Sequence, residues 1–378
     1  MMDPRLSRMA RILIRYSTRV RKGDRVSISG ETAAIPLMEQ LYLEALKAGA
    51  HPHVDVSIPS LSRYFYKFAG KEQLAYVSPL AEAMEEGFDV AIVVMSEENP
   101  HHLSGVDPRK QALRHKSLSG LSARQVERMV SGELRSCTTL YPTNAYASAA
   151  EMALEDFEDF VFKACYVDHP DPLARWRQVH RYQDRIIAYL SKRSSIHLQA
   201  PGTDLRFSYE GRRWMNCDGL LNFPDGEIFT CPIEDSVEGV VEFTYPACLY
   251  GREVEGVRLV FEKGRVVEAS ARKNEEFLLE MLDTDPGARR LGEFAIGTNK
   301  GVDRFTKNVL FDEKIAGTCH LAVGLSAPGC GGTNHSAIHW DMVCDLRRGG
   351  CVEVDGKVIL KNGRFLRASW PAPATRRR

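Results

Sequence analysis

A histidine and an aspartate two residues apart, His339 and Asp341, have the clearest chemical potential in this sequence. They lie in residues 331–343, which open on two glycines and continue through β-branched and aromatic residues typical of a strand. Because successive side chains of a strand point to opposite faces, His339 and Asp341 project together from one face. An imidazole held beside a carboxylate is half of a metal site. A lone pair of this kind is more often a surface contact, so a site requires further ligands.

Three more ionisable residues each follow a turn and enter an apolar strand. Glu227 follows a Pro-Asp-Gly turn, Glu293 follows a glycine, and His320 lies between glycines 317 and 324. Each residue alone is typical of a solvated strand end. Together with His339 and Asp341 they give three carboxylates and two imidazoles, a ligand set that suits zinc, cobalt or manganese. If the five converge within about 8 Å and one carboxylate bridges, they are enough for two metals.

Length and composition describe an ordinary globular protein. The 378 residues are 44% hydrophobic and 26% charged, which favours two domains with a substantial core. Fifty basic residues balance fifty acidic ones, so the sequence argues against a nucleic-acid partner. No apolar run reaches the roughly 18 residues of a membrane helix. Nine cysteines without a C-x-x-C motif indicate reduced thiols and the cytoplasm. Cys319 and Cys330 adjoin the candidate ligands, and we expect both to be bystanders.

The periodicity of apolar residues changes near residue 195. Before it, predicted strands at 25–29, 51–57 and 88–95 alternate with helices such as 35–48, a pattern of βαβ units with a parallel sheet. After it, short strands and hairpin dipeptides such as Asp355-Gly356 dominate. We therefore predict an α/β fold: an N-terminal α/β domain over residues 1–195, and a β-rich α+β domain over 196–378 that carries the metal site.

The sequence resembles the M29 metalloaminopeptidases, the thermophilic aminopeptidase (aminopeptidase T) family, almost from end to end. The matching stretches include KGDRVSISG from residue 22, KAGAHPHVDV from 47, NFPDGEIFTCP from 222, RLGEFAIG from 290, FDEKIAGTCHLAVG from 311 and GGTNHSAIHWDMV from 331. The resemblance implies that Glu227, Glu293, His320, His339 and Asp341 ligate two divalent metal ions. It also implies a C-terminal catalytic domain and a homodimer.

One position departs from the family pattern. Members of the family usually carry a tyrosine seven residues after the metal-binding histidine, where it is thought to polarise the substrate. This sequence has Ala327 there, within Gly324-Leu-Ser-Ala-Pro328. Loss of one electrophilic hydrogen-bond donor can cost on the order of 10²–10³ in turnover.

The leading hypothesis is a metalloaminopeptidase that removes N-terminal residues from peptides through a water activated by two metals. Glu227 or Glu293 would bridge the metals or act as the general base. The alternative is an Fe(II) ring-cleaving dioxygenase of the 2,5-dihydroxypyridine type, in which His320, His339 and Asp341 bind one iron. The missing tyrosine fits that alternative, whereas the retained Glu227 and Glu293 favour the peptidase. A third reading, a catalytically silent binding scaffold, would not require all five ligands.

Overall fold

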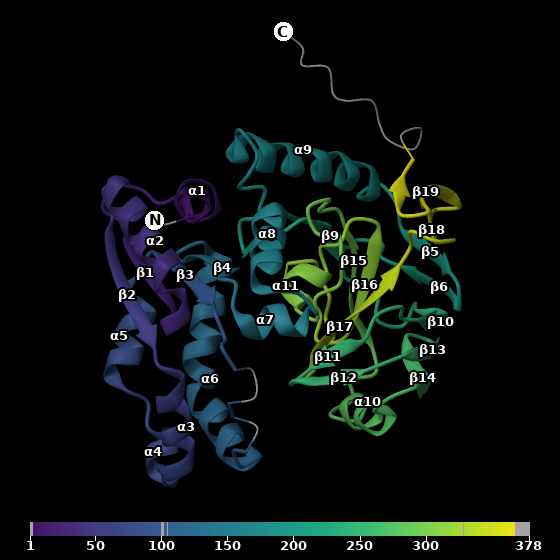
Figure 1. The fold of residues 1–378 in the computed structure, drawn as a ribbon. Helices are drawn as coiled ribbons and strands as arrows, with labels where there is room; N and C mark the ends of the chain where they lie inside the picture. The colour runs from purple at the N-terminus through teal and green to yellow at the C-terminus, as the bar shows by residue number, and fades with distance from the viewer. Residues whose placement is uncertain (1–2, 100–101, 104, 328, 367–378) are drawn as a thin grey trace. The chain divides into compact units, whose positions relative to one another are not determined.

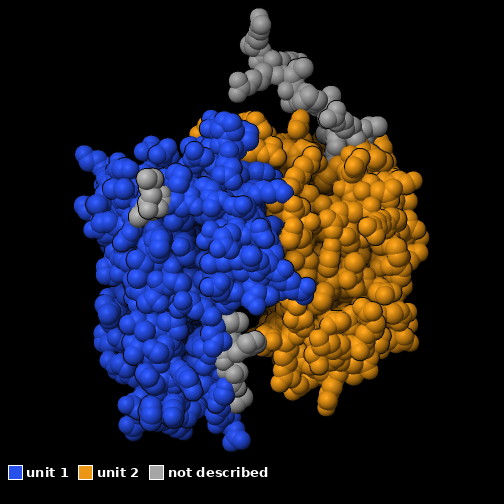
Figure 2. Space-filling model, viewed as in Figure 1, with its two compact units in different colours: residues 1–173, 219–224 blue, residues 174–218, 225–378 orange. Residues whose placement is uncertain are grey.

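The computed structural model describes residues 3–99, 102–103, 105–327 and 329–366. The chain forms two compact units, one of residues 1–173 with 219–224 and one of residues 174–218 with 225–378 (Figure 2). Helix α9 (Pro172–Leu190) falls almost wholly in the second unit, because Ile186 and Leu190 pack into the β-rich core. The domain boundary at 195, which was placed where the sequence periodicity changes, stays a prediction.

The first unit is an α/β layer built on a parallel sheet (Figure 1). Its strands run in the order β2-β1-β3-β4-β8, and every pair is parallel. The strands are β1 (Arg25–Glu31), β2 (His51–Ser57), β3 (Val90–Met95), β4 (Arg135–Leu140) and β8 (Asn222–Phe223). The helices are α1 (Pro4–Ile12), η1 (Leu13–Ser17), η2 (Thr32–Ala34), α2 (Ile35–Lys47), α3 (Pro59–Phe68), α4 (Lys71–Ala75), α5 (Pro79–Gly87), α6 (Pro108–Ser131), α7 (Asn144–Ala149) and α8 (Leu154–Ala164).

The second unit contains two larger antiparallel sheets. One has the order β14-β13-β10-β6-β5-β18-β19-β20 and the other β17-β16-β15-β9-β7. The strands of the first are β5 (Ser195–Ala200), β6 (Thr203–Ser208), β10 (Glu238–Glu242), β13 (Arg258–Glu262), β14 (Arg265–Ser270), β18 (Cys351–Val354), β19 (Lys357–Lys361) and β20 (Arg364–Phe365). The strands of the second are β7 (Met215–Cys217), β9 (Glu227–Thr230), β15 (Leu291–Gly297), β16 (Thr318–Gly324) and β17 (His339–Asp345). A small ribbon of β11 (Ala247–Leu249) and β12 (Arg252–Val254) and the helices α10 (Glu275–Leu282) and α11 (Val309–Asp312) complete it.

The fold class predicted from the sequence, α/β followed by a β-rich region, is confirmed. The hairpin predicted at Asp355-Gly356 joins β18 to β19, and both turn residues have positive φ, as this kind of tight turn requires. Among the described residues, no helix combines the length and the apolarity that crossing a bilayer requires.

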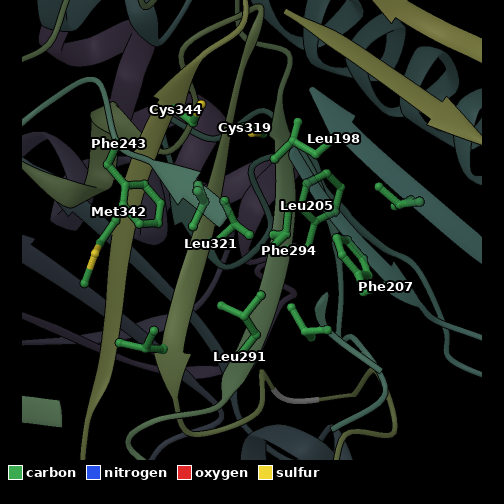
Figure 3. Packing of buried hydrophobic residues seen from close by; sticks show 14 of the residues in the cluster. Leu198, Leu205, Phe207, Phe243, Leu291, Phe294, Cys319, Leu321, Met342 and Cys344 are labelled. Carbon is green, nitrogen blue, oxygen red and sulfur yellow. The ribbon is translucent and has the colours of Figure 1, made fainter. Parts of the chain in front are cut away.

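The core of the second unit lies between its two sheets (Figure 3). Phe294, Leu321 and Met342, from three neighbouring strands of the five-stranded sheet, pack in one cluster with Leu198 and Phe207 of the other sheet. Alternation along each strand then sends the intervening residues to the opposite face of the five-stranded sheet. That opposite face carries the candidate ligands.

Candidate metal centre

The five predicted ligands project from four adjacent strands. Glu227 begins β9, Glu293 lies on β15, His320 lies on β16, and His339 and Asp341 lie on β17. Glu227, Glu293 and His320 are buried, whereas His339 is partly exposed. The structure therefore brings together all five residues that the sequence singled out. Their role as metal ligands remains a proposal.

Small residues between the ligands let them lean toward one another. Ala322 on β16 pairs with Glu293 on one side and with Asp341 on the other. A methyl group between the two carboxylates leaves the space above it open. Gly292, at the β-bulge before Glu293, has no room for a side chain, because a Cβ atom there would lie 2.1 Å from the Leu325 carbonyl oxygen.

The ligand atoms approach to within a few ångströms. His320 Nε2 lies 3.4 Å from Glu227 Oε2, 3.2 Å from Glu293 Oε1 and 3.9 Å from Asp341 Oδ1. His339 Nε2 lies 3.6 Å from Glu293 Oε2 and 3.4 Å from Asp341 Oδ2. Each oxygen of Glu293 thus faces a different histidine.

Hydrogen bonds outside the cluster orient two of these residues. His339 Nδ1 lies 2.8 Å from the Leu325 carbonyl oxygen, which can only accept a hydrogen bond, so Nδ1 donates and Nε2 is the ring nitrogen that faces the carboxylates. Gln183, a buried residue of α9, donates from Nε2 to the carbonyl of Glu227 at 2.6 Å and to Thr298 Oγ1 at 3.2 Å. These contacts fix the backbone from which the Glu227 side chain projects.

Two further charged residues at the cluster, Glu313 and Lys314, were not singled out from the sequence. They follow α11, and Lys314 is fully buried. Lys314 Nζ lies 2.7 Å from Glu227 Oε1 and 2.6 Å from Glu313 Oε2. Glu313 forms a close group with His320 and Asp341, whose ligand atoms lie within 4.8 Å of one another. Both residues lie in the motif FDEKIAGTCHLAVG, where the EK pair before the candidate histidine was the available signal.

Crowded negative charge shifts the pKa values in the cluster. Burial alone would lower the pKa of His320, but the carboxylates, Glu227 foremost, raise it to about 10. Burial, and then the charge of Glu313, raises the pKa of Asp341 to about 8. Burial raises the pKa of Glu227 despite its contact with Lys314, whereas Lys314 overcomes burial and lowers the pKa of Glu313.

The donor set fits divalent metal ions. Glu227 Oε2 and Asp341 Oδ1 are buried, and neither forms a hydrogen bond. Buried carboxylate oxygens are normally satisfied, so two unsatisfied oxygens in one cluster indicate that cations belong there. Carboxylate oxygen and imidazole nitrogen are the donors that zinc, cobalt and manganese accept.

Cys319 and Cys330 do not belong to this donor set. Cys319 lies in the hydrophobic core, opposite Cys344 on β17, as expected for the residue that precedes His320 on a strand (Figure 3). Cys330 packs with Cys231 in a small buried cluster. Cys217, which the sequence did not single out, forms a separate close group with Asp225 and Glu227.

Ala327, at the position of the family tyrosine, is 4% exposed and packs against Cys231 and Cys330. Its backbone N–H donates to the carbonyl of Gly292, next to Glu293. The backbone of Ala327 is therefore held beside the candidate metal ligands, but its side chain packs against the two thiols. Pro328 lies outside the described residues.

A cavity of about 190 Å³ adjoins the cluster. His339, Asp341 and Val343, which share one face of β17, form one wall. The other lining residues are mostly apolar or neutral, with three charged side chains among them: Pro246, Cys248, Leu249, Phe305, Lys307, Val309, Asp312, Glu313 and Trp340. A substrate group beside the cluster would therefore meet a largely apolar pocket.

Comparison with known proteins defines the class of this protein. The chain matches the family model of the thermophilic metalloproteases (M29) over residues 2–365, and a metalloprotease hydrolyses peptide bonds with the help of divalent metal. The chain belongs to this M29 family. The resemblance inferred from the sequence is thereby confirmed.

Named relatives agree with this assignment. "Aminopeptidase 2" of Geobacillus stearothermophilus is 29% identical, over 94% of this chain and 95% of that protein. "Aminopeptidase T" of Thermus thermophilus is 31% identical, over 84% of each. The solved structure of wild-type AmpT from Thermus thermophilus superimposes with a TM-score of 0.84 at 27% identity, covering 97% of this chain and all of that one.

The dioxygenase considered as an alternative shares the fold alone. The structure of the 2,5-dihydroxypyridine dioxygenase from Pseudomonas putida KT2440 gives a TM-score of 0.59 at 15% identity, covering 98% of this chain and 97% of that one. Proteins so distant in sequence can share a scaffold and differ in chemistry.

Proposed function

We propose that this chain is an aminopeptidase that removes N-terminal residues from peptides at a two-metal centre held by Glu227, Glu293, His320, His339 and Asp341. The observation that carries the proposal is the position of Glu293, whose two oxygens face two different histidines. One carboxylate between two imidazoles is the arrangement that a bridging ligand requires.

The ligands divide into two groups that share Glu293. Glu227 Oε2 and His320 would hold one metal, and His339 and Asp341 the other. Lys314 occupies Glu227 Oε1, which leaves Glu227 a single oxygen for metal. Glu293 would therefore bridge two metals more readily than Glu227, which would ligate only one.

When bound, divalent metals lower the pKa of a coordinated water and polarise the scissile carbonyl. The chain must also supply a proton acceptor. Glu313 is ionised because Lys314 lowers its pKa, and it lies beside His320 and Asp341. We therefore assign general-base catalysis to Glu313 in preference to Glu227 and Glu293, which are occupied as ligands.

The cavity next to His339 and Asp341 would receive the side chain of the first substrate residue. Its apolar walls, Leu249, Phe305 and Val309 among them, favour an apolar side chain, because burying such a group releases water from both surfaces. The free α-amine of the substrate would lie toward Glu313 and the metals.

An exposed apolar surface on the first unit supports the proposal of a homodimer. Helix α3 has no buried residue, and its apolar side chains Leu61, Tyr64 and Phe68 are 57%, 56% and 72% exposed. A surface of this kind typically marks an association site. The sequence has nine cysteines and no C-x-x-C motif, a pattern typical of reducing compartments, and we propose the cytoplasm.

The experiment is a metal count together with an assay. Protein purified without chelator should contain two zinc, cobalt or manganese ions per chain by elemental analysis. It should hydrolyse leucine p-nitroanilide and leave the N-acetylated compound intact, because acetylation removes the free amine. A single iron with oxygen uptake on a dihydroxypyridine would establish the dioxygenase instead. No hydrolysis of several aminoacyl anilides by metal-loaded protein would refute the aminopeptidase.

A further inference from the structure

Lys314 is unusual because its whole side chain is inaccessible to solvent. It is 0% exposed, whereas lysine is among the residues least often buried. A buried ammonium group is costly unless it is paired. Lys314 has two partners, Glu227 and Glu313, which raise its pKa well above the ordinary value despite burial.

The backbone of Lys314 is fixed as firmly as its side chain. Its N–H donates to the Phe311 carbonyl at the end of α11, at 2.9 Å, and its carbonyl accepts from the Asn299 N–H at 3.0 Å. Asn299 in turn donates from Nδ2 to the carbonyl of Asp225, two residues before Glu227. The lysine and the glutamate are therefore held on one rigid framework.

The two oxygens of Glu227 have different surroundings. Oε1 receives the ammonium of Lys314 at 2.7 Å. Oε2 forms no hydrogen bond and lies 3.4 Å from His320 Nε2, inside the cluster. The lysine thus fixes the rotation of the carboxylate and points one oxygen at the metal position.

We propose that Lys314 is a positioning residue of the metal centre, which holds the Glu227 and Glu313 carboxylates so that each presents one oxygen to the site. The inference rests on the proposed metal-binding function. Partners that orient a metal ligand commonly matter 10- to 100-fold for metal affinity. We expect an effect of that size, although removing a cation would by electrostatics alone strengthen metal binding.

The test substitutes Lys314→Met, which keeps an unbranched apolar stem and removes the ammonium. The dissociation constant for Zn²⁺ is measured by competition with a chromophoric chelator, and the Co²⁺ absorption spectrum reports the ligand geometry. We expect a 10- to 100-fold weaker affinity, an altered Co²⁺ spectrum and a lower kcat with a smaller change in KM. Lys47→Met is the matched control, because Lys47 pairs at 2.8 Å with Glu44, a buried glutamate of the first unit.

Lys314→Arg separates position from charge. Arginine keeps the positive charge, but its planar fork cannot place one donor where Nζ lies. We expect an intermediate metal affinity. If Lys314→Met does not fold, the test rests on Lys314→Arg. A metal affinity of Lys314→Arg equal to that of the wild-type chain would then overturn the positioning role. Unchanged or tighter metal binding by a folded Lys314→Met variant also overturns it. Failure of the wild-type chain to bind metal or hydrolyse any substrate would instead refute the proposed function.

Discussion

Glu293 Oε1 lies 3.2 Å from His320 Nε2, and the second oxygen of the same carboxylate lies 3.6 Å from His339 Nε2. One side chain therefore contacts both histidines of the cluster, which come from different strands. Asp341 also faces both histidines, but its Oδ1 lies farther from His320 Nε2, at 3.9 Å. Several consequences of this arrangement can be measured.

Glu293→Gln should reduce bound metal from two ions to one or none. The amide keeps the shape of the side chain, but its nitrogen cannot ligate a cation. Turnover should fall by at least about 10³, as expected when a group that acts directly in the transition state is lost. Elemental analysis and the leucine anilide assay measure both effects. Cys330→Ala is the control and should keep its metal; a metal-free Cys330→Ala variant would mean that the thiol is a ligand.

Metal affinity should rise with pH. Asp341, with a pKa raised to about 8 by burial, and His320, with a pKa raised to about 10 by its carboxylate neighbours, hold protons at neutral pH without metal. Metal must displace those protons, so the apparent affinity should increase up to about tenfold per pH unit for each proton released. Calorimetric metal titrations at pH 6, 7 and 8, in buffers that differ in ionisation enthalpy, give the number of protons released on binding. An affinity independent of pH would contradict this view of the cluster.

Asp312 makes a separate prediction about folding stability. It is buried, accepts hydrogen bonds from Thr306 N and Oγ1, and has its pKa raised by burial from 3.8 to about 8. Between these values the folded state holds a proton that the unfolded state has lost. The free energy of unfolding should therefore fall as pH rises through this window, by at most about 1.4 kcal/mol per unit.

Asp312→Asn removes the titration and keeps an acceptor for Thr306. Its stability should vary less between pH 5 and 7.5 than that of the wild-type chain, measured by urea unfolding. The same slope in both proteins would show that Asp312 does not titrate in that range.

Ala327→Tyr tests whether a phenol at the position of the family tyrosine raises turnover, but the structure shows that the side chain needs additional space. Because the Ala327 side chain is buried against Cys231 and Cys330, a tyrosine there overfills the space and should cost about 1–3 kcal/mol of stability. Cys231→Ala makes room. We expect the double variant Cys231→Ala/Ala327→Tyr to turn over aminoacyl anilides about tenfold or more faster than Cys231→Ala alone. A regained electrophilic hydrogen-bond donor can raise turnover by up to about 10²–10³-fold. Equal turnover would mean that the phenol does not reach the substrate from this loop.

Substrate preference should follow the apolar cavity beside the centre. Leucine anilide should have a higher kcat/KM than the alanine, glutamate and lysine anilides, with leucine over alanine by about tenfold or more. Val309→Asp should shift the preference toward lysine, because it adds a negative charge to the lining. Val309 begins α11 and is 56% exposed, so an aspartate there is compatible with the helix.

Val267→Asp is the matched control for Val309→Asp. Val267 lies on β14, is 46% exposed and does not line the cavity, so the selectivity should not change. A chain that cleaves all four anilides equally well would show that the cavity does not receive the first side chain.

The sequence by itself determined which faces of the strands carry chemistry. Alternation puts His339 and Asp341 on one face of β17 and sends Trp340 and Met342 into the core, and this follows from local backbone geometry alone. The turn before Glu227 and the glycines around His320 likewise indicated ionisable residues held at strand ends. Local periodicity also predicted the parallel and the β-rich regions.

Only the tertiary structure decided which of those strands are neighbours and what completes the site. Lys314 and Glu227 are 87 residues apart, and a lysine after a short helix is by its local pattern an ordinary surface residue. Its burial follows from the segment that packs against Asn299, a contact that no local pattern encodes. Long-range packing also places the thiols around Ala327. It likewise gives the two oxygens of Glu227 different neighbours. Periodicity specifies the direction of a side chain, whereas its partners depend on long-range packing.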